Sequence, residues 1–490
     1  MDERVEIRRL ARGFACLSAL VATCAITKGW TLLPVAVFGL WSAITGKRGF
    51  TLLAFAYLPL LTCLNPVMVP SEGLAPTIAR VTFIVMCIIM AVSSSAYTGN
   101  GQIPLGGLVA YLLVAVISSI NGWFPAISYM KIINFFCFLV GIWFGTRNLY
   151  RNPKDLDLLY RGFFVMVLFL SFGSIAVWPF PTIAYQQNLY FALMEGSAYA
   201  SALAKEALAN DQMFVFAGVT YNSQCLGPVL ACCFAWVMCD MLFVARRFTR
   251  RHMVTLAAIV LPLYLTRSRT ALFALAVSIA VVAMMTMRRM ELHGRIKARV
   301  HSAMMVLLLL GIAWAGASEI RNRTITKWLR KTNDLATDNR TFNEALTASR
   351  EFLNEQNWYD FHQNPFLGMG FQVMEFHRDK YRGQTFVLSA PIEKGLLPLM
   401  ILGETGIVGL IVFCIFVICF MSGCRRRKLH VTAAMFIVLC ATNIGEATFF
   451  SPGGSGGILW MMSVVGGYVI DMKVRRREME ENQFVAYGGY

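Results

Sequence analysis

Long apolar runs alternate with short polar segments along almost the whole chain. Most runs have about 15 to 20 residues, which is the length that a helix needs to cross the hydrocarbon core of a bilayer. The pattern predicts an all-α polytopic membrane protein of about 14 transmembrane helices, with a range of about 12 to 14. The predicted spans are 12–27, 29–45, 50–66, 77–96, 103–120, 128–145, 162–179, 213–244, 253–266, 270–287, 302–317, 395–420, 431–447 and 458–472.

Two polar segments are much longer than the other connections, at about 180–212 and 318–394. A loop of that length without structure of its own is uncommon. The second segment is rich in aromatic residues, so we expect it to be ordered and partly helical. The chain then divides into five parts: 1–212 and 213–317 with N-terminal and middle spans, the loop 318–394, the spans 395–472, and a tail 473–490.

One helix is predicted inside the long loop, from about Thr341 to Phe361, because its apolar residues recur with helical spacing. The following stretch, "HQNPFLGMGF", contains Pro365, which does not continue a helix easily. Gly368 and Gly370 then allow a sharp reversal of the chain. Since this Gly-x-Gly neither follows a strand nor opens a Rossmann helix, the stretch predicts a turn that ends the helix, not a dinucleotide loop.

Composition and charge agree with a membrane protein. Hydrophobic residues make up 57% of the chain and charged residues 14%, against about 25% charged in soluble domains. The net charge is +17. If the N-terminus is cytoplasmic, every basic cluster falls on the inner side, which is the positive-inside pattern. The charge therefore indicates topology and not nucleic-acid binding: both termini are predicted in the cytoplasm and the loop 318–394 in the periplasm or outside the cell.

The thirteen cysteines lie in or at the ends of the predicted spans, and none is in the long polar loops. They show no Cys-x-x-Cys pair and no Cys/His spacing typical of a metal site. We therefore predict neither a disulfide framework, nor a bound metal, nor a cofactor.

Two arginines occupy an unusual position. Arg267 and Arg269, separated only by Ser268, lie between two spans in a tight hairpin that the topology places on the outer face. The positive-inside bias disfavours cations there. One interpretation is an ordinary loop, and the other is a forked clamp for phosphate or pyrophosphate, which guanidinium suits better than ammonium.

Other polar side chains near the outer ends of spans are secondary candidates. Ionisable groups at such places are costly and tend to be functional. Snorkelling or a helix-packing partner explains Arg80, Lys131 and Glu446 equally well. Asn222 stands at an outer span entry, where an interhelical hydrogen bond is the simpler explanation.

Three motifs in this order resemble the bacterial O-antigen ligase and O-antigen polymerase family: "LTRSRTALFALAVS", "TASREFLNEQNWYDFHQNPFLGMGF" and "EKGLLPLMILGETGIVGLIVF". In that family an outer Ser-Arg hairpin opens a span. A periplasmic loop follows with an arginine-bearing helix and a Pro-x-x-Gly-x-Gly turn, and a Glu-x-Gly-x-x-Gly span closes the pattern. The resemblance covers about residues 213–425.

The resemblance implies roles for particular residues. Arg267 or Arg269 matches the hairpin arginine and Arg350 the loop-helix arginine, which hold the pyrophosphate of a polyprenyl-linked glycan. Ligases of the family place a histidine before the closing span, where this chain has Glu393 and Lys394. Three alternatives follow: Glu393 replaces the histidine as the base, His362 or His377 folds into place, or the base is dispensable.

The resemblance implies a glycosyltransferase at the outer face of the bacterial inner membrane, without metal, acting on a polyprenyl-pyrophosphate-linked oligosaccharide. An acceptor glycan or lipid supplies the attacking hydroxyl, Glu393 and Arg350 are the catalytic candidates, and other glycan-assembly proteins are expected partners. The missing histidine favours a polymerase over a ligase. An alternative of another class is a transporter or flippase of lipid-linked glycans, although it would not need so large an ordered loop.

Overall fold

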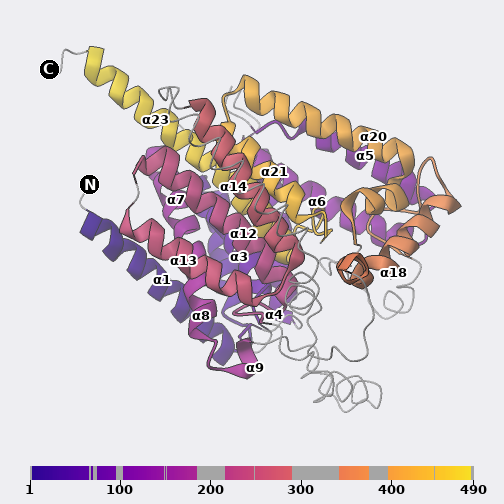
Figure 1. The fold of residues 1–490 in the computed structure, drawn as a ribbon, viewed down its shortest axis with the longest axis horizontal. Coiled ribbons are helices and arrows are strands. Elements are labelled where there is room, and N and C mark those ends of the chain that lie inside the picture. Colours follow the sequence, from indigo (N-terminus) through magenta and orange to yellow (C-terminus); the bar gives the residue numbers. More distant parts are fainter. Residues whose placement is uncertain are drawn as a thin grey trace.

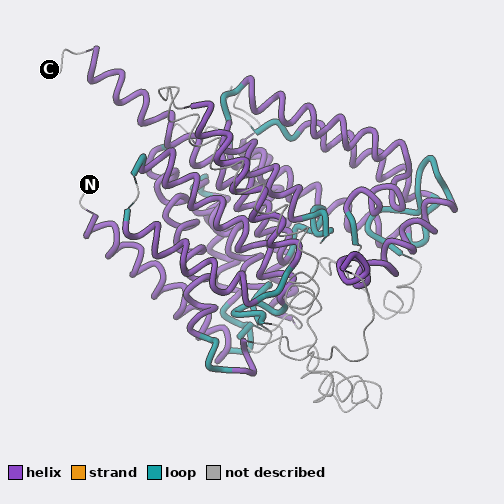
Figure 2. Tube along the Cα trace, in the orientation of Figure 1, coloured by secondary structure: helices purple, strands orange, loops and turns teal. Residues whose placement is uncertain are grey.

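The computed structural model describes residues 3–65, 68–69, 74–94, 103–147, 149, 152–184, 216–247, 249–289, 342–374, 395–445 and 447–486. Almost all of them lie in helices (Figure 2). Within these ranges there is no strand, only an isolated antiparallel bridge between Leu64 and Thr220. The all-α fold predicted from the apolar runs is confirmed.

The helices before residue 190 follow the predicted spans closely. They are α1 (Glu3–Ile26), α2 (Leu32–Ile44), α3 (Arg48–Thr62), α4 (Leu74–Ser94), α5 (Gly106–Ile120), α6 (Pro125–Thr146), α7 (Pro153–Leu168), which continues through the π-helix η2 (Phe169–Gly173) into α8 (Ser174–Ala176), and the short α9 (Pro181–Ala184).

The remaining helices belong to the middle spans, the long loop and the C-terminal spans. They are α12 (Ser223–Cys239) with η3 (Asp240–Ala245), α13 (Arg250–Leu265), α14 (Arg269–Arg289), α18 (Phe342–Gln363), α20 (Leu397–Arg426), α21 (His430–Thr442), and α22 (Gly454–Trp460), which continues through η6 (Met461–Val465) into α23 (Gly466–Ala486).

Seven of the described helices are long and apolar enough to cross a membrane. Five more apolar helices are shorter: Leu32–Ile44, Arg48–Thr62, Thr77–Val92, Gly106–Ile120 and His430–Thr442. The predicted span 302–317 and most of the predicted outer segment 180–212 lie outside the described residues. A multi-pass helical protein is therefore supported, while the predicted count of about 14 spans is not confirmed.

The helices differ in how much of their surface other helices cover. Of the 18 most apolar consecutive residues in Gly454–Gln483, which runs from α22 into α23, 94% are buried. The corresponding fraction for α20 (Leu397–Arg426) is 28%. The C-terminal helix is thus central, around the fully buried Trp460 and Tyr468. On α20, Ile407, Ile411 and Ile415 are exposed at intervals of four residues, which is the pattern of a lipid-facing stripe.

The two termini lie at the same end of the helix bundle, while α18 and the hairpin between α13 and α14 lie toward the opposite end (Figure 1). A contact fixes the direction of α13: Arg251 in its first turn bonds Glu6 of α1 at 2.9 Å. Its last residue, Leu265, therefore points away from the termini. Which of the two ends faces the cytoplasm stays a prediction of the charge pattern.

Candidate functional site

Helix α20 is broken near its start. Gly406 has φ 64° and ψ −166°, a backbone conformation that essentially only glycine adopts. At 1.5 Å per residue, the break lies about 14 Å along the helix from Leu397, inside a segment apolar enough to span a membrane. A break at that depth frees backbone N–H and C=O groups, which must then find partners within the protein.

A turn made of residues 364–374, called here the docked turn, supplies the partners of the first half of α20. The main-chain N–H of Met369 donates to the carbonyl of Gly403 at 2.9 Å, and that of Gly370 donates to the carbonyl of Glu404 at 3.1 Å. Both carbonyls are at the C-terminal end of a helical segment, where acceptors lack partners. The docked turn therefore caps this segment with its own backbone.

The same turn also satisfies the second half of α20. The N–H groups of Ile407 and Val408 donate to the carbonyls of Pro365 and Phe366 at 2.9 and 3.3 Å. These two donors begin a new helical segment, so they have no partner inside it. The break at residues 403–408, called here the α20 break, is thus closed on both sides by one turn.

Two glycines permit this close approach. A Cβ atom on Gly406 would stand 2.2 Å from the carbonyl oxygen of Phe366, and one on Gly368 would stand 2.4 Å from the carbonyl carbon of Glu404. Gly368 also has φ +69°, which favours glycine. The Pro-x-x-Gly-x-Gly and Glu-x-Gly-x-x-Gly motifs are therefore the two complementary halves of one packing arrangement.

The loop between α5 and α6 holds the docked turn from a third side. The N–H of Trp123 donates to the carbonyl of Met369 at 3.0 Å, and the N–H of Phe371 donates to the Ser119 hydroxyl at 3.2 Å. The Ser118 hydroxyl donates to the carbonyl of Glu404. The turn is therefore anchored between α5, α6 and α20, and it does not hang freely in the loop.

Lys131, predicted as a secondary candidate, contributes to the same anchoring. It is buried on α6, and its Nζ donates to the carbonyl of Gln372 at 2.8 Å. Gln372 has φ +54°, an uncommon conformation for a residue with a side chain. Of the two explanations offered by the sequence, a helix-packing partner is therefore the one that the structure supports.

Helix α18 agrees with the prediction and extends two residues further, from Phe342 to Gln363. The predicted stop also agrees, because the Asn364 side chain accepts from the N–H of Leu367 at 3.2 Å and starts the turn. The extension places His362 in the last helical turn. The sequence pattern predicted that the helix ends at about Phe361, one residue before His362.

The inner face of α18 is polar and buried. Asn357 and Asp360 are 1% and 3% exposed. Asp360 accepts from the indole Nε1 of Trp123 at 3.1 Å, and the Asn354 amide oxygen accepts from the N–H of Leu396 at 3.3 Å. These contacts fix α18 both to the loop after α5 and to the residues that open α20.

The outer face of α18 is aromatic and exposed. Trp358, Tyr359 and His362 lie there, and the rings of Trp358 and His362 are 4.8 Å apart. The His362 Nδ1 stands 2.8 Å from the carbonyl of Trp358. This local bond is with a residue of the same helix, and His362 is exposed while Asn357 and Asp360 are buried.

The arginine hairpin is as tight as predicted. Helix α13 ends at Leu265 and α14 begins at Arg269. Thr266 and Ser268 are buried, and the Ser268 hydroxyl accepts from the N–H of Ala271, which caps the start of α14. Arg267 and Arg269 alternate with them and are half-buried. The buried hydroxyl residues thus fix the backbone from which both arginines project.

The backbone of Arg267 is unusual. Its φ is +49°, in the left-handed region that costs a residue with a side chain about 1 kcal/mol or more. Glycine would adopt this conformation without that cost. Lys28, Arg246, Gln372 and Lys428 also have a positive φ, so this conformation by itself does not assign a task to the Arg267 side chain.

A continuous set of contacts joins this hairpin to α18. A Cβ on Gly445 would stand 2.2 Å from the Thr270 hydroxyl, so the segment after α21 packs directly on the start of α14. Two residues earlier, the carbonyl of Asn443 accepts from the N–H of Leu397 at 3.3 Å. The neighbouring Leu396 is bound to Asn354 of α18. The hairpin, the start of α20 and α18 are therefore parts of one assembly.

The placement of several predicted residues is not described. Arg350 is on α18, but its side chain is outside the described part, and Glu393, Lys394, His377 and Glu446 are outside it altogether. Arg350 comes four and seven residues before Asn354 and Asn357, a spacing that puts residues on one helix face. The convergence of Arg350 with the hairpin arginines stays a prediction.

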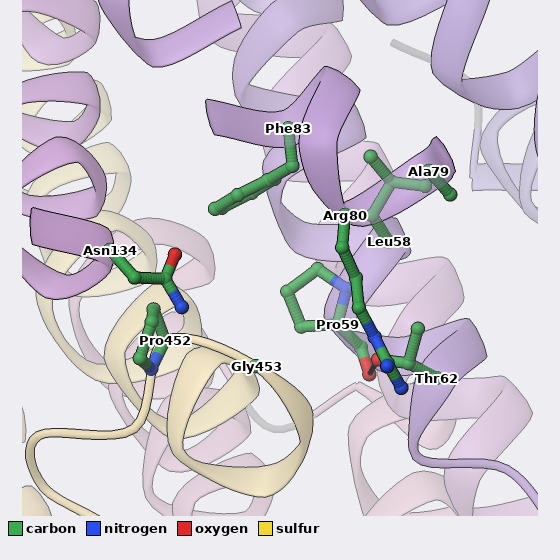
Figure 3. Close-up of a pocket in the computed structure, with 9 residues that line it drawn as sticks. All are labelled: Leu58, Pro59, Thr62, Ala79, Arg80, Phe83, Asn134, Pro452 and Gly453. Carbon is green, nitrogen blue, oxygen red and sulfur yellow. Dashed lines mark hydrogen bonds between the residues drawn. The ribbon is translucent and has the colours of Figure 1, made fainter. Parts of the chain in front are cut away.

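Arg80 lines a separate small cavity of about 40 Å³. The walls of this cavity are mostly apolar. The Arg80 side chain extends past Pro59 toward Thr62, and Asn134 and Pro452 lie on the other side of the cavity (Figure 3). That volume is far below the range of about 300–1,000 Å³ for ligand pockets. Nothing in this geometry assigns Arg80 to a pyrophosphate site.

Asn222 has a local role. Its side-chain oxygen accepts from the N–H groups of Gln224 and Cys225 at 2.5 and 3.2 Å, so it caps the start of α12. The interhelical hydrogen bond that the sequence suggested is replaced by a cap. Asn222 therefore positions α12, on which the arginine hairpin packs through Gly227.

Glu404 opens the Glu-x-Gly-x-x-Gly motif, but it is not among the site residues predicted from the sequence. It is 1% exposed in the α20 break, and its backbone carbonyl accepts from both Ser118 and Gly370. An acidic residue ten residues inside a long apolar run is a signal that sequence reasoning can use, because charge is costly there.

Comparison with known proteins agrees with the motif resemblance. Residues 254–414 match the family model described as O-antigen ligase. The match begins in α13, passes through the hairpin and α18, and ends in α20 beyond the break. No curated protein matches the chain.

Proposed function

We propose, on the premise that residues 254–414 make this chain a member of the O-antigen ligase family, that it transfers a glycan from polyprenyl pyrophosphate to an acceptor at the outer face of the cell membrane. The observation that carries the proposal is the set of contacts linking the arginine hairpin, α18 and the start of α20. All three elements lie in the matched segment, and they are the elements that carry or directly adjoin the predicted pyrophosphate ligands and the predicted base.

The proposed reaction needs no nucleotide sugar, because the donor is already activated. The acceptor hydroxyl attacks the anomeric carbon, a new C–O bond forms, and the bond from that carbon to the phosphate oxygen breaks. Polyprenyl pyrophosphate leaves with the electron pair. The hydroxyl proton passes to Glu393, which is one residue from the Lys394–Gly395 entry to α20.

Arginines supply the electrostatic part of this mechanism. Negative charge grows on the pyrophosphate as the bond breaks, and fixed guanidinium groups stabilise it. Arg267 and Arg269 are held by a capped hairpin whose intervening hydroxyl residues are buried. Arg350 is expected on the face of α18 that carries Asn354 and Asn357. Removal of one such donor typically costs about 10²–10³ in kcat.

Ligase and polymerase differ only in the acceptor. The family description favours transfer to a lipid or protein acceptor, as in a ligase. One sequence feature supports the polymerase alternative: the stretch 391–403 contains no histidine. In a polymerase, a second lipid-linked glycan is the acceptor and products grow in length.

A transporter is less well supported by the same site. Broken helices in transporters direct their free ends at substrate or ions. In this protein the docked turn occupies both ends of the α20 break with four backbone hydrogen bonds. The break therefore has protein partners where a transporter would have its cargo.

The test is reconstitution in liposomes with a polyprenyl-pyrophosphate oligosaccharide and either a lipid A-type acceptor or no added acceptor. We expect release of polyprenyl pyrophosphate together with glycosylated acceptor. Longer lipid-linked chains without added acceptor would assign a polymerase. Movement of the intact donor across the bilayer with no pyrophosphate release would refute a transferase.

Arg269→Gln is the variant to compare in that assay, with Arg246→Gln as its matched control. Arg246 also lies in a short helix connection, but it bonds Glu481 near the end of the C-terminal helix α23. We expect loss of pyrophosphate release only for Arg269→Gln. Equal activity of the two variants would remove the hairpin from the mechanism.

A further inference from the structure

A second polar site lies at the end of the bundle that carries the termini, away from the proposed transferase site. It is a pocket of about 370 Å³, within the range of about 300–1,000 Å³ found for ligand pockets. Four basic side chains line it, from two segments far apart in the sequence: Arg247, Arg251, Lys473 and Arg477. Among the described residues, the only acidic side chain on its wall is Glu6.

Arg251 is fixed in this wall by a buried network. Its guanidinium bonds Glu6 at 2.9 Å and lies 3.4 Å from the Tyr160 hydroxyl and 3.7 Å from Asp240. Asp240 is fully buried and also accepts from Tyr160 at 2.7 Å, and it lies 2.9 Å from the Nε2 of His252. The orientation of Arg251 is therefore set before any ligand arrives.

The two C-terminal cations are likewise held in place. Lys473 bonds Asp157 at 2.7 Å and lies 4.3 Å from the centre of the Tyr160 ring. Arg477 donates to the carbonyl of Val244 at 2.7 Å and to Glu481 at 2.9 Å. These contacts use part of the hydrogen-bonding capacity of each cation, since a guanidinium has five N–H donors and an ammonium three.

Arg247 differs from the other three. The neighbouring Arg246 has φ +52° and bonds Glu481 at 3.2 Å. Arg247 follows on the pocket wall and is exposed, and among the described residues no ion pair of Arg247 is found. Its planar fork is thus available to an anion in the pocket, beside three cations that are already oriented.

We propose that this pocket binds a phosphate group. Basic pockets between helices on the cytoplasmic side bind the phosphate head groups of anionic lipids, and arginine forks match phosphate oxygens in a bidentate way. The wall carries four cations and one carboxylate. Asp157, Asp240 and Glu481 orient three of these cations and offset part of their charge, so Arg247 is the cation that has no ion pair among the described residues. The phosphate comes either from an anionic lipid of the inner leaflet or from free phosphate in the cytoplasm.

This site does not depend on the proposed transfer reaction. The positive-inside rule explains why basic residues gather at this end of the bundle. It does not require that they surround one cavity, nor that a buried Asp-Tyr-His network orient one of them. The shared cavity and the fixed geometry are what distinguish a binding site from an ordinary basic surface.

The test uses the full-length purified protein in phosphatidylcholine nanodiscs. Binding of phosphatidylglycerol is measured by native mass spectrometry of the released complex, and binding of inorganic phosphate is measured by the shift in melting temperature. Arg247→Glu is the test variant, because Arg247 has no side-chain hydrogen bond or ion pair with another described residue. Arg250→Glu is the matched control: it makes the same charge change three residues away, on an exposed arginine outside the pocket wall.

We expect one saturable phosphate-bearing ligand per protein. Arg247→Glu should weaken its binding by about tenfold or more, and Arg250→Glu by about twofold or less. Saturable binding of phosphatidylglycerol alone identifies a lipid head group, and binding of inorganic phosphate with similar affinity identifies free phosphate. Equal losses in both variants, or no saturable binding of either probe, would overturn the proposal.

Discussion

Replacement of Gly406 by alanine tests the fit between the docked turn and the α20 break. The new Cβ would stand 2.2 Å from the carbonyl oxygen of Phe366 and 2.6 Å from the main-chain nitrogen of Leu367. Both are backbone atoms, so no side chain can rotate away. The residue would also have to keep φ 64° and ψ −166°, which is available essentially only to glycine.

The cost depends on which of two responses follows. Holding alanine in that conformation costs about 1–3 kcal/mol. If the turn moves away instead, four backbone hydrogen bonds are lost, each worth about 0.5–1.5 kcal/mol net and more where water cannot replace them. The second response therefore costs roughly 2–6 kcal/mol, against a total stability of about 5–15 kcal/mol for a folded protein. Gly406→Ala should therefore loosen the turn or unfold the protein.

Gly106→Ala is the matched control. Gly106 begins α5, and a Cβ there would meet nothing within 4 Å. Alanine should be neutral or stabilising by about 0.4–1 kcal/mol, because it reduces the freedom of the unfolded chain. Melting temperatures in one detergent, with limited proteolysis of the 364–374 segment, measure both variants. Equal melting and equal protection of Gly406→Ala and Gly106→Ala would refute the account of the break.

Three further predictions concern single side chains. Arg267→Gly should keep or raise the melting temperature, because glycine accepts φ +49°, but it should abolish pyrophosphate release. Arg246→Gly is the control: it relieves a similar φ of +52° at the other end of the bundle and should keep activity. Retained activity in Arg267→Gly would contradict the clamp. Lys131→Met should destabilise by about 1–3 kcal/mol by leaving the Gln372 carbonyl without its partner, seen as faster proteolysis of the turn; unchanged cleavage would refute the anchoring role. In transfer assays on membranes, Glu393→Gln should be severely impaired and His362→Ala mild, and the reverse order would assign the base to the histidine.

The helices themselves follow from the sequence. Apolar runs of membrane-crossing length predict helices, because only a helix satisfies every backbone group within one apolar segment. The end of α18 also follows from neighbouring residues. Asn364-Pro365 stops a helix through the chemistry of those two residues, and α18 ends at Gln363. The tight connection at Arg267 and Arg269 could also be read from the two spans that flank it.

The α20 break could not be found in this way. "GETG" lies inside a long apolar run, and glycine is tolerated in membrane helices, so its glycines alone do not distinguish a break from a continuous helix. What decides it is a turn some 40 residues earlier, whose carbonyls and N–H groups bond both sides of Gly406. The roles of Lys131 and Asp360 are hidden for the same reason, because their partners, Gln372 and Trp123, come from other elements.

The chain's periodicity therefore determines where helices form, since that depends on neighbours a few residues apart. Which polar groups meet is decided only when helices pack, because the partners of a buried donor or acceptor come from wherever the fold brings them. The pocket around Arg251 shows this most clearly: its wall joins Glu6 near the start of the chain to Lys473 near its end. The sequence shows basic residues at both places, and only the tertiary structure encloses them around one cavity.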